Sequence, residues 1–190
     1  MKTLVFIETD EGTAVASSWE ALGKARELGG DVSAVVIGHD IAQVADEAGR
    51  RGAQTVYTVD DPGRAVFDLD AYLADIKGIL DQNGADIFLA SHTTNGRDLA
   101  AALAVDLGVG IIADCLELQL VDGRLQGVRP LYSGNILADV TVDGTPQIAT
   151  IRPRAAAPAA PGEASGNVVQ VAPAPVEPRV QVEKVEHAEA

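Results

Sequence analysis

The sequence has little of what several large classes of protein require. Its single cysteine, Cys115, excludes an internal disulfide and a metal cluster built from cysteines. No apolar run approaches the ~20 residues of a membrane span. The apolar run within the opening MKTLVFIETDEG is too short for the apolar region of a secretory leader. Only 14 Lys and Arg stand against 28 Asp and Glu, a net charge of −14 that would repel nucleic acid and anionic membranes. We therefore expect a cytoplasmic protein that binds no nucleic acid and does not insert into a membrane.

Common signatures of nucleotide, metal and catalytic sites are also missing. Neither G-x-x-x-x-G-K-[ST] nor a G-x-G-x-x-G after the first predicted strand is present. Residues 8–11 (ETDE) follow that strand instead, and their carboxylates would repel a pyrophosphate. His39, His92 and His187 have no ligand spacing with one another or with Cys115, so no metal site is predicted. His92 has the pKa range of an acid or base, but the sequence pairs it with no nucleophile or carboxylate, and no catalytic residue is predicted.

What the sequence does contain is an alternation of short apolar runs and amphipathic segments. Strands are predicted at four apolar or β-branched runs, residues 4–7, 32–37, 55–59 and 87–90. Helices are predicted after each of them; the clearest has apolar residues at 69, 73, 76 and 80 and places Asp75 among its outward-facing charges. Four such alternations with short connections predict an α/β fold with a doubly wound parallel sheet.

The stretch from residue 86 to residue 107 is the first candidate region for function. A buried strand runs into a polar turn, residues 91–95, in which Thr94 or Asn95 can cap the following helix. Ligands and partners of open α/β sheets gather outside the carboxyl ends of the strands. Arg97 and Asp98, in the first turn of the helix, are therefore candidates for contact with a ligand or partner, although they could simply pair with neighbours.

Beyond residue 107 the pattern predicts antiparallel strands. Leucines alternate with other residues before Asp122-Gly123, a hairpin signal. Two further strands are predicted at residues 136–142 and 147–151, on either side of Asp143-Gly144. We expect these strands to form an antiparallel β extension of the parallel core.

Three residues of this extension, Arg129, Tyr132 and Asn135, are predicted to contact a partner. The segment Gly134-Asn135 permits a turn with positive φ, which explains those two residues structurally. It does not explain the neighbouring arginine and tyrosine, which are residue types enriched in protein interfaces.

The last part of the chain, residues 155–190, is rich in alanine and proline and is predicted to be a linker or tail that follows a domain of residues 1–154. Its valines are unusual for a solvated linker. We expect them to form short edge strands that pair with another chain or domain; they are Val168, Val169, Val171, Val180, Val182 and Val185.

Three segments in order resemble a known family: GADIFLASHTTNGRDLAAALAVDLGVGIIADC, VRPLYSGNILADV and PQIATIRPR. From residue 2 to about residue 154 the chain is similar to the amino-terminal domain of the electron transfer flavoprotein α subunit, including its FixB relatives. One departure is that members commonly carry Pro-Arg where this chain has Ala101-Ala102.

The resemblance implies a subunit of an electron carrier rather than a catalyst. In that family an α subunit pairs with a β subunit, and the heterodimer holds FAD and passes electrons from dehydrogenases, such as acyl-CoA dehydrogenases, to a quinone reductase or another acceptor. FAD is bound mainly by a second, carboxyl-terminal domain of the α subunit, and AMP by the β subunit. The 190 residues end before any such FAD segment, so the resemblance implies a scaffold domain that holds no FAD by itself.

A second interpretation comes from a different class of protein. A free-standing nucleotide-binding module of the universal-stress-protein kind would use the turn and helix start at residues 91–98. Such proteins carry Gly-x-x-Gly and a later Gly-Ser, and Gly96 alone matches this pattern poorly.

Overall fold

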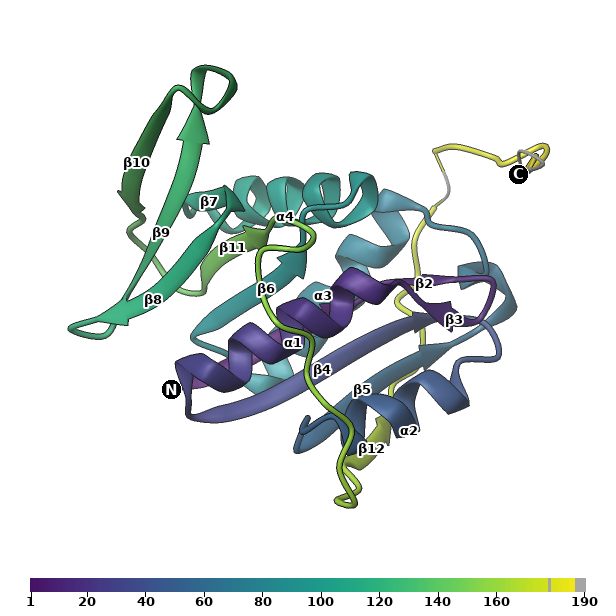
Figure 1. The fold of residues 1–190 in the computed structure, drawn as a ribbon. Helices are drawn as coiled ribbons and strands as arrows, with labels where there is room; N and C mark the ends of the chain where they lie inside the picture. The colour runs from purple at the N-terminus through teal and green to yellow at the C-terminus, as the bar shows by residue number, and fades with distance from the viewer. Residues whose placement is uncertain (178, 187–190) are drawn as a thin grey trace.

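The computed structural model describes residues 1–177 and 179–186, so His187 and the end of the predicted tail lie outside the described residues. A sheet of seven parallel strands forms the centre of the molecule (Figure 1), in the order β12-β5-β4-β1-β6-β11-β7. Its strands are β1 (Lys2–Ile7), β4 (Asp31–Gly38), β5 (Thr55–Asp60), β6 (Ile87–Ser91), β7 (Ile111–Cys115), β11 (Gln147–Ile151) and β12 (Asn167–Gln170). The predicted α/β fold with a parallel sheet is confirmed.

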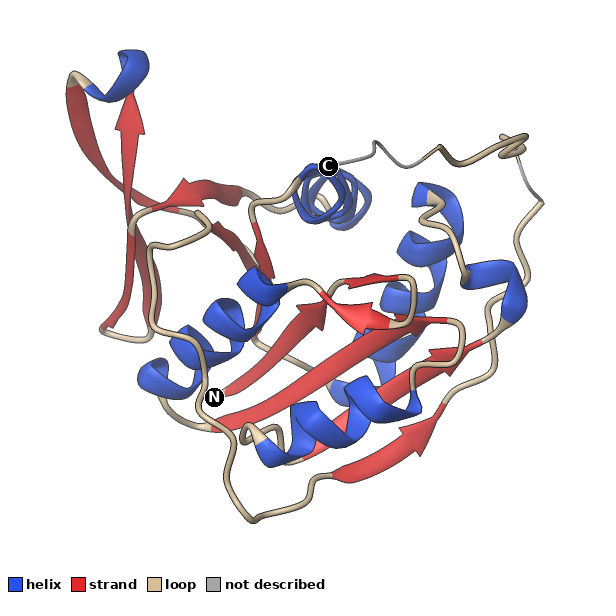
Figure 2. Ribbon diagram, turned by 45° about the vertical axis from the view of Figure 1, so that its right-hand side comes forward, coloured by secondary structure: helices blue, strands red, loops and turns tan. Residues whose placement is uncertain are grey.

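Helices cover both faces of this sheet (Figure 2): α1 (Ala16–Leu28), α2 (Ala42–Arg50), α3 (Leu69–Asn83) and α4 (Thr94–Leu107). The buried residues fall into two clusters, one with α1 and α2 and the other with α3 and α4. Along β1, Val5 and Ile7 belong to the first cluster, while Leu4 and Phe6 belong to the second. This alternation makes the strand apolar on both faces, as the sequence indicated. Within the described residues, no helix is both long enough and apolar enough to span a membrane.

The ends of α3 and α4 carry common capping residues. Gly84 and Gly108 adopt left-handed backbone conformations, with φ of 64° and 65°, and end α3 and α4. The predicted cap of α4 is wrong by one or two residues: Thr93, not Thr94 or Asn95, has the extended backbone of an N-cap, and its Oγ1 accepts the Gly96 N–H at 3.0 Å.

The charged face predicted for α3 needs one correction. Asp75 is only 3% exposed, because Arg64 of the short helix η1 (Pro62–Arg64) reaches it and forms an ion pair at 2.6 Å. The helical pattern placed Asp75 outside because its partner lies on another element.

The position predicted for residues 147–151 is wrong. These residues form β11, which is not part of the antiparallel extension but lies parallel between β6 and β7. All five of its residues are buried, as expected of a strand covered on both faces. The chain after Asp143-Gly144 therefore returns to the central sheet instead of forming a hairpin.

The antiparallel extension itself is present and projects from one end of the central sheet (Figure 1). It consists of β8 (Glu117–Val121), β9 (Arg124–Leu131) and β10 (Ile136–Thr141), in the order β10-β9-β8. Asp122 and Gly123 have φ of 51° and 78°, the two positive values of a tight hairpin turn, so that prediction is confirmed. A short helix, η2 (Tyr132–Gly134), forms the tip between β9 and β10.

The segment after β11 packs along the outside of the domain before it forms β12. The Ala159 N–H donates to Trp19 O at 2.8 Å, and the Gly162 N–H donates to Arg50 O at 2.7 Å. β12 then pairs in parallel with β5, with Val168 opposite Val56. The edge strand expected around Val168 exists, but it pairs with β5 of its own domain and not with another chain or domain. The described residues 171–177 and 179–186, which include the other predicted valines, form no helix or strand.

Candidate functional site

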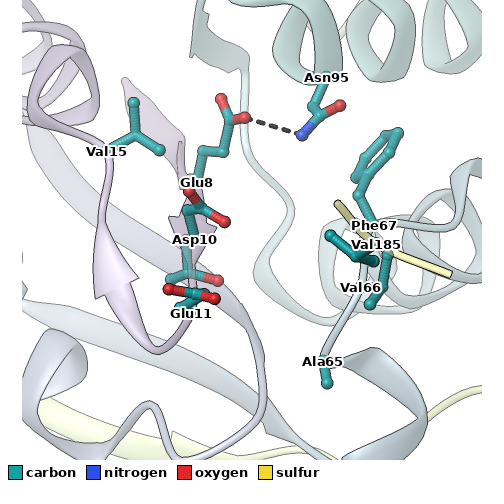
Figure 3. Close-up of a pocket in the computed structure, with 10 residues that line it drawn as sticks. Glu8, Asp10, Glu11, Val15, Ala65, Val66, Phe67, Asn95 and Val185 are labelled. Atoms are coloured by element: carbon teal, nitrogen blue, oxygen red, sulfur yellow. Dashed lines mark hydrogen bonds between the residues drawn. The ribbon is translucent and has the colours of Figure 1, made fainter. Parts of the chain in front are cut away.

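The order of the strands places a switch point between β1 and β6. From β1 the chain moves outward to β4 and β5, and then returns to the other side of β1 as β6. Crevices at the carboxyl ends of such strands are the usual ligand sites of open α/β sheets. A small hairpin of β2 (Thr9–Asp10) and β3 (Thr13–Ala14) follows β1 at this point, and a cavity of about 580 Å³ opens beside it (Figure 3).

Glu8, directly after β1, lies beside the start of α4 in this crevice. Its carboxylate accepts hydrogen bonds from Thr93 Oγ1 and, at 2.9 Å, from Asn95 Nδ2 at the start of α4. Its own N–H donates to Ser18 Oγ at 3.0 Å, and the residue is 8% exposed. A helix N-terminus attracts anions through its free N–H groups and its dipole. Here a carboxylate of the chain itself lies beside that terminus, bound by side chains of the N-cap residue and the first turn.

The cavity has one acidic wall and one apolar wall (Figure 3). Glu8, Asp10 and Glu11 form the acidic wall, and Phe67 with Val185 of the tail faces them. Carboxylates at this density repel phosphate groups. The residues present therefore do not fit the phosphates of FAD or of an adenine nucleotide.

A second polar group lies further along the same edge of the sheet, where β6, β11 and β7 end. Asp114 accepts two hydrogen bonds from Arg152, from Nε at 2.9 Å and from Nη2 at 2.5 Å. Thr150 Oγ1 accepts the Asp114 N–H at 3.0 Å and lies 2.8 Å from His92 Nδ1. Asp114 also has a left-handed backbone, with φ of 63°, where the pairing of β7 with β11 is irregular.

The environment of this group shifts three pKa values. Hydrogen bonding to Arg152 lowers the pKa of Asp114, and burial lowers the pKa of His92 despite the nearby Asp114 carboxylate. Burial raises the pKa of the Cys115 thiol to about 12, which keeps this thiol protonated and unreactive at neutral pH. At pH 7 the group therefore holds a neutral imidazole, a neutral thiol and a closed ion pair.

The residues singled out from the sequence lie near this group, although not all of them meet. Arg97 and Asp98 are exposed and pair with each other at 2.9 Å at the start of α4. Arg97 and Arg129 both lie close enough to His92 to influence its pKa. Tyr132, which is 76% exposed, lies at the tip of the extension.

The tip of the extension adds a recess to this edge of the sheet. Asn135 Nδ2 donates to Tyr132 O at 2.8 Å and so stabilises the turn at the tip. The neighbouring Ser133 and Gly134 line a recess of about 400 Å³ together with Pro130, Asp114 and Arg152. The extension therefore reaches the ion pair of the sheet.

Sequence reasoning missed Glu8 as an acceptor and missed the pair of Asp114 with Arg152. The pair is formed between β7 and β11, which the sequence did not place side by side. The only local signal was an arginine directly after a strand, in Ile-Arg-Pro-Arg. The sequence identifies Glu8 only as a charge that repels phosphate; its partners Thr93 and Asn95 follow only from the three-dimensional structure.

Comparison with known proteins gives a consistent result. The family described as "Electron transfer flavoprotein domain" matches residues 3–176. The electron transfer flavoprotein subunit alpha of Syntrophomonas wolfei is 34% identical over 151 residues, which cover 80% of this chain and 48% of that protein. Protein FixB of Azorhizobium caulinodans is 36% identical over 159 residues, which cover 79% of this chain and 43% of that protein. The electron transfer flavoprotein subunit alpha of Bacillus subtilis is 32% identical over 154 residues, which cover 80% of this chain and 47% of that protein. The chain thus spans about half the length of these curated relatives.

Proposed function

The chain belongs to the electron transfer flavoprotein family, and we propose that it is the amino-terminal scaffold domain of an α subunit of the FixB type. In this role it docks on a β subunit and supports the FAD-binding domain of the α subunit. The complete cytoplasmic complex, with FAD and with AMP in the β subunit, carries electrons from dehydrogenases to a quinone reductase or another acceptor. The domain itself is a structural part of a carrier and catalyses no reaction.

The observation that supports this proposal most is the position of Glu8. Its carboxylate, bound by Thr93 and Asn95, lies where a nucleotide phosphate would approach α4. An α/β domain whose phosphate position is filled by its own side chain is suited to binding proteins through its surfaces rather than to binding a dinucleotide.

The surface for the β subunit includes the residues singled out from the sequence: Arg97, Asp98, Arg129, Tyr132 and Asn135. The projecting β9–β10 hairpin supports this choice, because Ile136 and Leu137 are 50% and 62% exposed next to Tyr132. Exposed apolar groups gathered with tyrosine and arginine are typical of surfaces that a partner covers.

One observation favours the second interpretation, a free-standing nucleotide-binding module: the cavity beside Glu8 lies at the switch point where such modules bind nucleotides. Its acidic wall opposes that interpretation. Titration calorimetry with ATP and AMP decides between the two, because micromolar binding to the chain by itself would favour the nucleotide module.

The scaffold proposal is tested by mixing the purified chain with the β subunit of the same organism. We expect an equimolar complex in size-exclusion chromatography with light scattering, and no flavin absorbance in the chain purified alone. A chain that retains a reducible flavin by itself, or that forms no complex with the β subunit at tens of micromolar, would contradict the proposal.

A further inference from the structure

Arg129 forms no hydrogen bond or ion pair within the part of the chain that the structure describes. The residue is partly buried, and its Nε is shielded from solvent without any hydrogen bond. It extends from β9 towards the end of the sheet, where it is close enough to influence the pKa values of Asp114 and Cys115. A shielded N–H without an acceptor destabilises the structure that contains it. The free chain therefore carries an unfavourable group at this place.

The surrounding charges leave one positive charge uncompensated. Asp114 is already engaged by Arg152 through two hydrogen bonds, and Arg97 is paired with Asp98. His92 contributes no charge at neutral pH, because burial lowers its pKa. The guanidinium of Arg129 thus matches a single negative charge, as carried by one carboxylate, better than the two or more charges of a pyrophosphate.

The surface beside Arg129 is shaped for a protein rather than for a small anion. The recess lined by Ser133, Gly134 and Pro130 also includes Asp114, whose pKa Arg129 influences. The exposed Tyr132 and Ile136 lie on the same hairpin as Arg129. Arginine and tyrosine are residue types that dominate binding in protein interfaces.

We propose that Arg129 binds an aspartate or glutamate side chain of the β subunit, which is inserted beside the tip of the β9–β10 hairpin and covered by Tyr132 and Ile136. This inference rests on the proposed function. A planar guanidinium pairs with a carboxylate through two parallel hydrogen bonds. The partner thereby supplies the acceptor that the free chain lacks.

Two measurements on the Arg129→Met variant test this inference. We expect the melting temperature of the free chain to stay constant or to rise by about 2–4 °C, because an unpaired charge is removed. The dissociation constant of the complex with the β subunit should increase by roughly 30-fold or more, because a carboxylate is left unpaired in the interface. A residue with only a structural role would instead lower the melting temperature of the free chain.

Two further variants separate this pairing from general electrostatics. Arg129→Lys keeps the charge without the planar fork and should weaken binding to an intermediate degree. Arg50→Met removes an exposed arginine on α2 that is paired with Asp46, and should change the dissociation constant less than about twofold.

Four results would overturn the inference. Binding by Arg129→Met within about twofold of the unmodified chain, or equal losses in Arg129→Met and Arg50→Met, would show that no specific pair exists. A lowered melting temperature of Arg129→Met would assign Arg129 a structural role. Calorimetric binding of inorganic pyrophosphate that depends on Arg129 would identify a phosphate site. In each case the unmodified chain still binds the β subunit, whereas failure of the proposed function appears as no binding by the unmodified chain.

Discussion

Arg64 and Asp75 form a two-pronged ion pair between η1 and α3, with Nε 2.6 Å from Oδ2 and Nη2 3.2 Å from Oδ1. The Asp75 side chain is 0% exposed. The tail completes the pair, because the Ala174 N–H donates to Asp75 Oδ1 at 2.6 Å and Ala174 O accepts from Arg64 Nη2 at 3.0 Å. One buried pair thus joins a turn, a helix and the segment after β12.

Removal of one side chain of the Arg64–Asp75 pair should therefore destabilise the folded chain. We expect Asp75→Ala to lower the free energy of unfolding by about 3–5 kcal/mol, because Arg64 and Ala174 lose their acceptor in a buried place. Urea unfolding followed by circular dichroism measures this. Asp46→Ala is the matched control, since it breaks the exposed pair with Arg50 and should change stability by less than about 1 kcal/mol. Similar small effects in both variants would contradict the structural role of the pair.

The packing of α1 against the segment after β11 can be tested with two helical glycines. A Cβ at Gly23 would lie 2.2 Å from Ala157 O, whereas one at Gly78 of α3 would meet nothing within 4 Å. Helix propensity favours alanine at both positions, so we expect Gly78→Ala to raise the free energy of unfolding by roughly 0.5–1 kcal/mol. Gly23→Ala should lower it by about 1–3 kcal/mol, because the backbone must shift. If urea unfolding shows both variants stabilised, residues 155–160 do not pack against α1.

The role of Glu8 at the start of α4 predicts a difference between two substitutions. Glu8→Ala removes the acceptor of Thr93 and Asn95, and we expect a loss of about 1–3 kcal/mol in the free energy of unfolding. Glu8→Gln keeps an acceptor and should lose less. Chemical denaturation of both variants measures the difference, and equal stability of Glu8→Ala and the unmodified chain would refute this role.

The buried position of His92 predicts a pH dependence of stability. Its pKa is lowered from 6.5, chiefly by burial, so the unfolded chain binds a proton at a pH where the folded chain does not. The contribution of neutral His92 to the free energy of unfolding is therefore fully present above pH 6.5, and it decreases as the pH falls towards the pKa of His92 in the folded state. We expect the free energy of unfolding to fall less between about pH 7.5 and pH 5.5 in His92→Gln than in the unmodified chain. Parallel slopes in urea unfolding would contradict this expectation.

Local features of the fold could be predicted from the sequence because neighbouring residues determine them. The strand at residues 87–90 and the turn at Asp122-Gly123 each depend on a few adjacent side chains. The place of β11 in the central sheet does not depend on adjacent side chains, since a short apolar run looks the same in an extension and in a central sheet. Its partners Phe88 and Ile111 are distant in sequence.

The candidate site shows the same limit. Arg97, Asp98 and Arg129 could be singled out by residue type and position, but the pair of Asp114 with Arg152 required the adjacency of β7 and β11. The periodicity of α3 predicts Asp75 on the wrong side of the helix for a related reason, because its partner Arg64 lies outside that helix.

The late arrival of β11 and β12 has a consequence for synthesis on the ribosome. β6 gains its second neighbouring strand, β11, only when residues 147–151 have left the ribosome. β5 gains its second neighbouring strand, β12, only when residues 167–170 have followed. Until then both strands offer unpaired backbone groups to other chains. Nascent or truncated polypeptides that stop before residue 147 are therefore expected to aggregate more readily than the complete domain and to depend more on chaperones.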